Sequence, residues 1–379
     1  MNTNNSKFLI ALIQELMRNM NNWYGSDNWD ADLFGPYNTT YKSTMVTKFN
    51  ELFPSRLAIL PVNWDREVIQ NVSMIQDSIE ELGYVYDLLG DESSKSTLVQ
   101  VLTYRLMGHK KVKLPLNSET YWSQRRGTKA LINGKETIKV TFLDWQLRRF
   151  ALDKIGYPIE VFFIPAGIMA TFISKQYEYR KRTPEIKAQE GDYVIDGGGC
   201  WGDTALYFAH EVGERGKVFT FEFGSDNLKV FDRNMRLNPQ LSSRIEVFPK
   251  ALWENSREKI SYSADGPATS LAINQKNGTK SSEVLTVSID DFVREKKLPR
   301  VDFIKMDIEG AELGALKGAE ETLRTFRPKL GISVYHKEND LIEIPTYLKK
   351  LGLGYKFFLD HFSIYANETV FFATTAINT

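Results

Sequence analysis

A strand that ends in a glycine turn constrains this chain more than any other segment. Tyr193 to Asp203 reads YVIDGGGCWGD, a short apolar run followed by an acid and four glycines. Glycine adopts positive φ and lacks a Cβ, so a ligand can approach the backbone of such a turn closely. Residues 204–212, TALYFAHEV, have helical spacing, and Gly213 is placed to cap that helix. Strand, turn and helix together predict the first βα unit of a nucleotide-binding sheet.

The turn and the next strand supply the predicted contacts to a nucleotide-like ligand. Residues 217–223, KVFTFEF, form a second strand with Glu222 near its end, and this carboxylate can accept hydrogen bonds from both hydroxyls of a ribose. Asp196 is expected to orient the turn or to meet an amino group of the ligand, and Thr204 to cap N–H groups at the helix start. The ligand-contacting residues predicted in the turn are Asp196, Gly197, Gly198, Gly199, Gly202 and Thr204. A match to GxGxxG alone does not separate dinucleotide enzymes from methyltransferases.

A later strand adds two carboxylates. Residues 300–312, RVDFIKMDIEGAE, predict a buried strand that ends in Asp307 and Glu309, followed by a helix over residues 311–323. Open α/β sheets bind their ligands at the carboxyl ends of the strands. We therefore expect both acids to lie at the ligand-binding edge of the sheet.

The last two strands favour one family of sheets. Residues 355–362 and 368–374 predict a closing antiparallel hairpin, which is typical of methyltransferases and not of dehydrogenases. The segments VIDGGGCWGDTALYFA, FEF, VDFIKMDIEGAELGALKGAE and RPKLGISVYH, together with this hairpin, resemble the FkbM family of S-adenosylmethionine-dependent O-methyltransferases. The resemblance covers about half of the chain, from residue 190 onward.

The resemblance implies a fold, a cofactor and an acceptor. The fold is an α/β, Rossmann-like class I methyltransferase sheet of seven strands with the last one antiparallel, and the methyl donor is S-adenosylmethionine. The acceptor is a hydroxyl group, frequently on a sugar, a glycolipid or polysaccharide precursor, or a polyketide. The family usually has a GAN-type triplet where this chain has GGGCWG, so Cys200 and Trp201 replace residues that normally face the donor. Asp307 is implied to be the acid nearest the methionine part of the donor or its methyl group. The expected apolar sandwich for adenine is Phe223, Ala251 and Leu252.

Methyl transfer to a hydroxyl needs alignment and a base. The reaction is an in-line displacement, so the protein aligns donor and acceptor and helps to remove the hydroxyl proton. His336 is the first choice for the base, because it follows the strand GISVY and its ordinary pKa suits proton transfer near neutrality. The alternative is that His336 bonds a carboxylate or caps a helix, and that His361 contacts the substrate or is a structural partner of Asp360. The candidate catalytic residues are His336, Asp307, Glu309 and His361.

A divalent metal is a further alternative at this edge. Two carboxylates and a nearby histidine are ligands that such ions accept. The sequence has no metal-ligand spacing signature, and we predict no metal.

Composition narrows the class of protein. The chain has 379 residues, 42% of them hydrophobic and 25% charged, which is ordinary for a globular protein. Its 48 Lys and Arg residues balance 48 Asp and Glu residues, so no overall field attracts nucleic acid or an anionic membrane. A single cysteine cannot form an intramolecular disulfide, which favours a cytoplasmic location. The apolar run at Phe8 to Ile13 is too short for a membrane span and predicts an amphipathic helix instead.

Two domains are expected. Residues 1–165 predict a mainly helical or mixed domain for acceptor recognition or oligomerisation, and residues 166–379 the S-adenosylmethionine-binding domain. Aromatic residues between positions 21 and 41 favour either a sugar-stacking surface or the interface of a homo-oligomer, and the choice stays open. These residues are Trp23, Trp29 and Phe34, with Tyr24, Tyr37 and Tyr41.

Three functions remain in competition. The first is an O-methyltransferase for a sugar hydroxyl in polysaccharide biosynthesis, with no nucleic-acid partner. The second is an NAD-dependent Rossmann oxidoreductase, which would share the glycine turn and Glu222. The third is a non-catalytic interaction module that only retains the donor.

Overall fold

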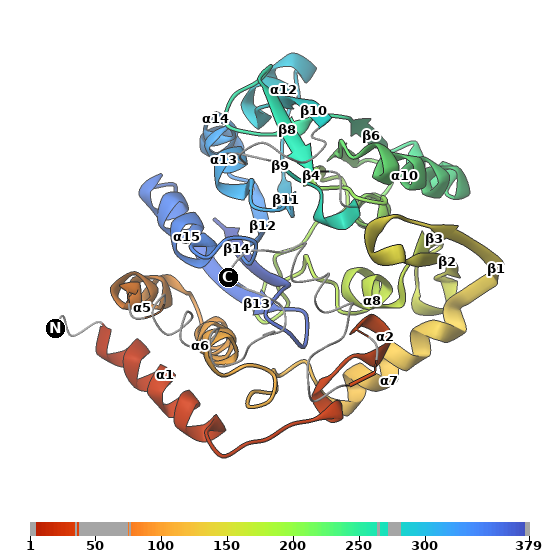
Figure 1. The fold of residues 1–379 in the computed structure, drawn as a ribbon. Coiled ribbons are helices and arrows are strands. Elements are labelled where there is room, and N and C mark those ends of the chain that lie inside the picture. The colour runs from red at the N-terminus through yellow and green to blue at the C-terminus, as the bar shows by residue number, and fades with distance from the viewer. Residues whose placement is uncertain are drawn as a thin grey trace. The chain divides into compact units, whose positions relative to one another are not determined.

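The chain divides into two compact units. The computed structural model describes residues 5–34, 36–37, 75, 77–263, 266–271 and 282–375 (Figure 1). Unit 1 comprises Met1–Trp122 and Val334–Ala373, and unit 2 comprises Ser123–Ser333 and Thr374–Thr379. A seven-stranded sheet has the order β13-β14-β12-β11-β4-β5-β6. With its flanking helices it confirms the predicted α/β fold.

Five strands of unit 2 form the parallel part of the sheet. They are β4 (Tyr193–Gly197), β5 (Lys217–Phe221), β6 (Ile245–Phe248), β11 (Phe303–Met306) and β12 (Lys329–Ser333). Every residue of β11 is buried, as expected for a parallel strand that is covered on both faces. Because these strands run in one direction, their carboxyl ends meet at one edge of the sheet.

The helices of unit 2 confirm one prediction and correct another. The helix predicted after the glycine turn is α9 (Asp203–Glu211). The single helix predicted over residues 311–323 is wrong, because the chain forms α13 (Glu312–Lys317) and then α14 (Glu320–Phe326). Asp290 causes the break: its carboxylate accepts hydrogen bonds from the backbone N–H groups at the start of α14, at 2.8 and 2.9 Å. The remaining helices are α8 (Pro165–Ile168), α10 (Ser225–Leu237), α11 (Pro239–Ser242) and α12 (Ile289–Lys296).

Two small sheets complete unit 2. One has the order β1-β2-β3 and the other β7-β10-β8-β9. Their strands are β1 (Ile132–Lys139), β2 (Gln146–Ala151), β3 (Glu160–Phe163), β7 (Ala251–Leu252), β8 (Lys259–Ser263), β9 (Ser270–Leu271) and β10 (Ser282–Val287).

The predicted domain boundary at residue 165 does not coincide with these units. β3 is bonded to α10, because Asn234 accepts from the N–H of Phe162 at 2.7 Å and Asn238 accepts from that of Glu160 at 2.9 Å. Residues 123–165 therefore belong with the parallel sheet, while residues 334–373 group with the N-terminal helices. The roles assigned to the two predicted domains stay predictions.

Unit 1 contains the N-terminal helices and the closing strands. The helices are α1 (Asn5–Asn19), α2 (Ala31–Phe34), α5 (Ile79–Leu88), α6 (Glu92–Met107) and α15 (Asp340–Lys350), and α7 (Glu119–Gly127) crosses the boundary. The closing strands are β13 (Lys356–His361) and β14 (Thr369–Thr374). They are neighbours in the sheet, and Phe362 donates across their link to Glu368 at 3.0 Å, as predicted for a hairpin.

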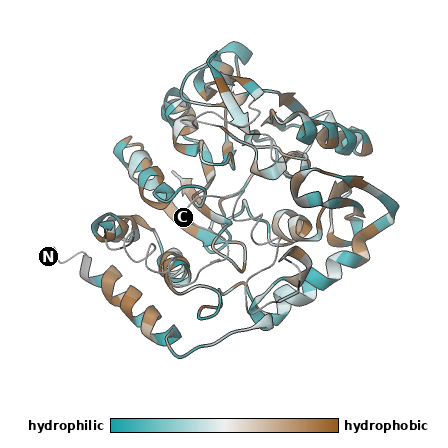
Figure 2. Cartoon of the chain, viewed as in Figure 1, coloured by the Kyte–Doolittle hydropathy of each residue, from teal (hydrophilic) through white to brown (hydrophobic). Residues whose placement is uncertain are grey.

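Apolar residues lie along α1 (Figure 2). Phe8 and Leu12 are buried, and the Phe8 ring lies 5.6 Å from that of Tyr86 on α5. Ile13 and Met17 of the same helix are 46% and 66% exposed. The predicted helix is confirmed, but its apolar surface is wider than the single face that the sequence predicted. No helix among the described residues is long and apolar enough to cross a membrane.

The N-terminal aromatic residues have different environments. Trp29 is 4% exposed and meets the Tyr37 ring edge-on at 5.6 Å, which makes it part of the core. Trp23 is 69% exposed, and the ammonium groups of Lys110 and Lys111 lie 5.5 and 5.2 Å from its ring centroid. Tyr41 lies outside the described residues.

Candidate active site

The glycine turn folds tightly against the neighbouring strands. The N–H groups of Gly198 and Gly199 both donate to the carbonyl of Phe221, at 2.9 and 3.1 Å. Gly198 has φ +81°, and a Cβ built there would lie 1.9 Å from the Asp307 carbonyl oxygen. Only glycine fits at this position. The turn therefore packs closely against the residues at which β5 and β11 end.

A buried ion pair lies beneath the turn. Asp196 and Lys305 are 0% and 1% exposed, and Lys305 Nζ lies 3.1 Å from Asp196 Oδ1. The Asp196 carboxylate also accepts hydrogen bonds from the hydroxyls of Thr204 and Thr220, at 3.0 and 3.2 Å. Burial lowers the pKa of Lys305, but the carboxylates of Asp196 and Asp307 outweigh it and the net pKa is raised. Lys305 therefore stays a cation at neutral pH.

Glu222 follows β5 at the same edge of the sheet. Its carboxylate accepts from the N–H of Gly224 at 2.6 Å and from Asn227 Nδ2 at 3.3 Å. Burial raises the pKa of Glu222 to about 7, and these hydrogen bonds oppose the rise. Asn227 Nδ2 also donates to the Gly266 carbonyl at 2.9 Å, which ties residues 266–271 to this acid. A carboxylate held in this way is suited to the two hydroxyls of a ribose.

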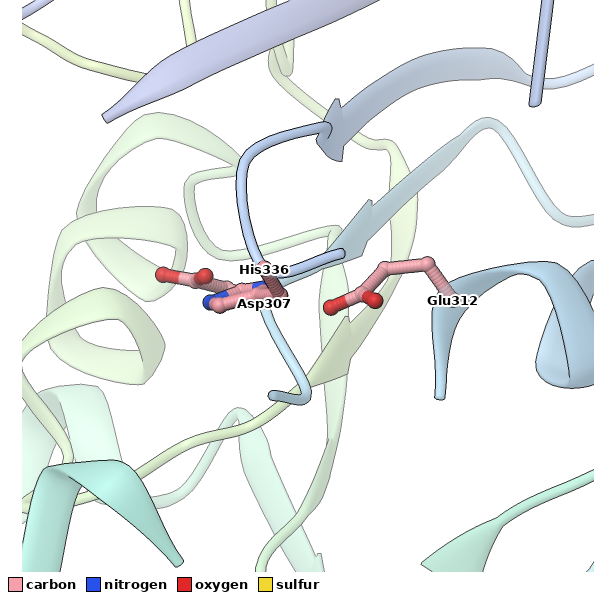
Figure 3. Close-up of side chains that lie close together, drawn as sticks. All are labelled: Asp307, Glu312 and His336. Atoms are coloured by element: carbon pink, nitrogen blue, oxygen red, sulfur yellow. The ribbon is translucent and has the colours of Figure 1, made fainter. Parts of the chain in front are cut away.

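The acids after β11 are also fixed. Tyr177 Oη donates to Asp307 Oδ2 at 2.8 Å, and Glu309 has φ +53°. Figure 3 shows the side chains of Asp307 and Glu312, which come from the end of β11 and the start of α13. Glu312 is buried and accepts from the N–H of Ile308 at 2.8 Å. The first residue of α13 therefore holds the loop that carries Asp307.

The two candidate histidines belong to unit 1. His336, also labelled in Figure 3, comes three residues after the end of β12, and its ring lies 4.2 Å from that of Tyr335. His361 Nδ1 lies 2.9 Å from Thr369 Oγ1, and its Nε2 lies 3.4 Å from Ser363 Oγ. Both ring nitrogens of His361 therefore lie near hydroxyls of its own hairpin. The catalytic roles of both residues stay predictions.

One pocket at the carboxyl ends of the strands gathers many of the predicted residues. Its lining includes Gly198, Glu222, Phe223, Ala251, Leu252, Asp307 and Glu309. The other predicted turn residues do not line it; these are Asp196, Gly197, Gly199, Gly202 and Thr204. Of the two residues where the turn departs from the family pattern, Cys200 lines the pocket and Trp201 is buried against Phe163.

Sequence reasoning missed part of this pocket. The lining also contains Lys250, Pro267, Thr269, Leu271, Ile308 and Ala311. Leu271 packs on Ala251 and Tyr262 in a small apolar cluster that also contacts Phe223. The signal available in the sequence was the small-residue loop from Gly266 to Leu271, which no motif connected to the donor.

A second cavity of about 620 Å³ lies elsewhere in unit 2. Tyr157, Lys175, His210 and Glu211 are among its lining residues. His210 and Glu211 end α9, whose first residue follows the glycine turn, so this cavity lies about 12 Å from the turn along the helix. Ligands of open α/β sheets bind at the carboxyl ends of the strands. The smaller pocket is therefore the candidate donor site.

The comparison with protein families agrees with this geometry. Residues 185–357 match the model of the methyltransferase FkbM domain. These residues form a methyltransferase domain of the FkbM family. The FkbM domain begins before β4 and ends in β13, so it contains the glycine turn, Glu222 and Asp307. The assignment confirms the family, and with it S-adenosylmethionine as the cofactor.

Several solved structures are similar to the chain, and one of them has a TM-score above 0.5. The methyltransferase FkbM from Methylobacillus flagellatus matches with a TM-score of 0.51 at 19% identity, over 79% of this chain and 60% of its own. This chain thus spans about three fifths of that protein. A SAM-dependent O-methyltransferase from Thermotoga maritima has a TM-score of 0.32 at 15% identity, over 51% of this chain and 63% of its own. Fibrillarin from Aeropyrum pernix, with bound S-adenosyl-L-methionine, has a TM-score of 0.33 at 12% identity, over 64% of this chain and 99% of its own. None of the curated proteins matches the chain.

The residues of the pocket fit this cofactor. Gly198 lets the turn backbone pack directly against the Asp307 carbonyl at the pocket, and Glu222 supplies a buried carboxylate for the ribose. Phe223, Ala251 and Leu252 supply the apolar wall that adenine needs.

Proposed function

We propose that the protein is an S-adenosylmethionine-dependent O-methyltransferase whose acceptor is a sugar hydroxyl in a polysaccharide or glycoconjugate precursor. The observation that carries the donor half of this proposal is the register of the sheet. Gly197 lies opposite both Phe221 and Met306, so the residues that follow each strand share one edge. Those residues are Gly198, Glu222 and Asp307. Support for a sugar hydroxyl comes from the resemblance of the sequence motifs to the FkbM family.

The chemistry assigns a task to each group. When bound, S-adenosylmethionine supplies a methyl group on a positively charged sulfur. Glu222 binds the ribose, and the glycine turn lies against the methionine part. Asp307, held by Tyr177, offers a negative charge near the sulfonium. The acceptor oxygen takes the methyl group from the face opposite sulfur, and the hydroxyl proton passes to a base.

His336 is the proposed base. An imidazole takes up a proton readily near neutral pH. The expected effect of His336→Ala is a fall in kcat of roughly a hundredfold or more, because positioned general bases contribute on that scale. Binding of S-adenosylhomocysteine should stay unchanged. Equal kcat values for the variant and the wild type would assign the proton transfer to another group.

The competing functions differ in what they predict. The FkbM domain assignment removes the support for an NAD-dependent oxidoreductase. A non-catalytic module would bind the donor and transfer no methyl group. Incubation with donor carrying a labelled methyl group and a panel of nucleotide sugars and methyl glycosides separates the cases. Label in a sugar supports the proposal; donor binding without label in any sugar supports the module.

Two further assignments belong to the proposal. The balanced charge and the single cysteine of the chain favour the cytoplasm. A homo-oligomer is proposed from the exposed aromatic and apolar side chains near the N-terminus, such as Trp23 and Met20. Light scattering gives the mass in solution, and a monomer at all concentrations would contradict the oligomer.

A further inference from the structure

Lys305 is a charged residue in an apolar strand. β11 reads FIKM, and its other residues are fully buried. Moving an ammonium group out of water costs free energy. The attraction within a buried ion pair often only just offsets this cost. Replacing a buried pair by apolar residues is often neutral or stabilising. A lysine at this position is therefore poorly explained by stability alone.

The contacts of Lys305 converge on the glycine turn. Its Nζ donates to the carbonyl oxygens of Gly197 at 2.9 Å and Gly198 at 2.6 Å. It also lies 3.1 Å from Asp196 Oδ1. An ammonium group has three N–H donors, and these three acceptors are consecutive residues of the turn. One side chain from β11 thus fixes the backbone that the donor approaches.

The same ammonium group is next to the support of Asp307. Nζ lies 5.3 Å from the centroid of the Tyr177 ring, within the range of a cation–π contact. Tyr177 is 3% exposed, and its hydroxyl donates to Asp307. Lys305 therefore contacts both parts of the edge that are expected to meet the methionine end of the donor.

We propose that Lys305 is a positioning residue for the methyl donor. Its ammonium group holds the glycine turn and, through Tyr177, Asp307 in the arrangement that binds S-adenosylmethionine. The inference rests on the proposed function, because it concerns the donor of that reaction. It assigns a role to the lysine that precedes Asp307 in the segment IKMDIEG, for which the sequence alone predicted none.

The test compares donor binding with folding. Lys305→Met keeps the length of the side chain and removes its charge and donors. Lys305→Met combined with Asp196→Asn also removes the partner charge, which protects folding. We expect the Kd for S-adenosylhomocysteine, measured by calorimetry, to rise at least about tenfold in both, a change of 1.4 kcal/mol. Circular dichroism and thermal melting report whether each variant is folded.

A matched control lies in the adjacent strand of the parallel sheet. Lys329 of β12 also pairs with an aspartate, Asp192 Oδ2, at 2.7 Å, but away from the turn. Lys329→Met should leave the Kd within about twofold of wild type. An equal loss of affinity in Lys329→Met and Lys305→Met would mean that any lost lysine weakens the sheet, and would overturn the inference.

A milder variant keeps the test decisive if the lysine variants unfold. Tyr177→Phe removes only the hydroxyl that holds Asp307. We expect it to raise the KM for the donor several-fold and to leave the KM for the acceptor unchanged, a split that general loosening would not produce. Unchanged donor KM and Kd would overturn the inference. A wild type that fails to bind S-adenosylhomocysteine would instead overturn the proposed function, and this inference with it.

Discussion

The two edges of the parallel sheet carry similar charge pairs in different surroundings. At the carboxyl edge, Asp196 and Lys305 are 3.1 Å apart and almost fully buried. At the opposite edge, the Arg300 guanidinium lies 2.6 Å from Asp302, and its side chain is 51% exposed. Separation therefore does not distinguish the two pairs, whereas exposure does.

The difference in exposure changes how much each ion pair contributes to the free energy of unfolding. An exposed pair contributes about 0–1 kcal/mol, because water solvates the partners when they separate. Breaking a buried pair costs roughly 3–5 kcal/mol, because the remaining charge has no solvent. The Asp196–Lys305 pair adds little net stability, and it lies beneath the glycine turn. We therefore infer that the carboxyl edge of the sheet is the functional one.

The largest expected effect concerns the buried pair. Lys305→Met should lower the free energy of unfolding by about 3–5 kcal/mol, because Asp196 then loses its countercharge. Urea denaturation followed by circular dichroism measures the change. A loss below about 1 kcal/mol would place this pair in the same class as the exposed one and remove the contrast between the edges.

The next effect is a pH dependence that only the carboxyl edge should have. Burial raises the pKa of Glu222 from its ordinary value of 4.5 to about 7. The Glu222 carboxylate, which we propose accepts hydrogen bonds from ribose, is then largely protonated at pH 6 and largely ionised at pH 8. We expect the affinity for S-adenosylhomocysteine to rise about tenfold over that range.

The pH dependence of stability has the opposite sign to that of donor affinity. Because the folded-state pKa is raised, the protonated acid is favoured in the folded protein. This contribution is complete below pH 4.5 and is lost as the pH rises through about 7. Glu222→Gln should remove the pH dependence of binding and this part of the pH dependence of stability. Asp203, whose pKa burial raises to about 6, should keep its own contribution to stability. An unaltered pH profile for binding in Glu222→Gln would assign the titration to another group.

The smallest effect is expected at the exposed edge. Arg300→Ala should change the free energy of unfolding by less than about 1 kcal/mol and leave donor affinity unchanged, because the Arg300 side chain is half exposed. Its partners also keep other contacts: Asp302 accepts from the Tyr193 N–H, and Asp192 pairs with Lys329. The same urea titration measures it. A loss as large as that of Lys305→Met would show that exposure is a poor guide to the weight of a charge in this sheet.

The sequence predicted the features that depend on local pattern. The glycines after β4 and the acids after β5 and β11 could be placed because strand, turn and helix follow one another along the chain. The register of parallel strands then brings Gly198, Glu222 and Asp307 to one edge without further information.

Features that depend on distant partners were not predicted. Lys305 bonds residues 107 and 108 positions away, and Tyr177 bonds an acid 130 positions away. In the sequence, Lys305 is a single charge that interrupts an apolar run. The break between α13 and α14 likewise depends on Asp290, which lies in a different helix. The grouping of residues 334–373 with the N-terminal helices has no local signal either.

The most direct test of the donor site is a calorimetric titration with S-adenosylhomocysteine and, separately, with NAD. It is made on the wild type, on Glu222→Ala and on Arg300→Ala. We expect micromolar binding of S-adenosylhomocysteine to the wild type and to Arg300→Ala, its loss in Glu222→Ala, and no binding of NAD. Binding of NAD alone, or S-adenosylhomocysteine affinity that is indifferent to Glu222, would contradict a methyl-donor site at this edge of the sheet.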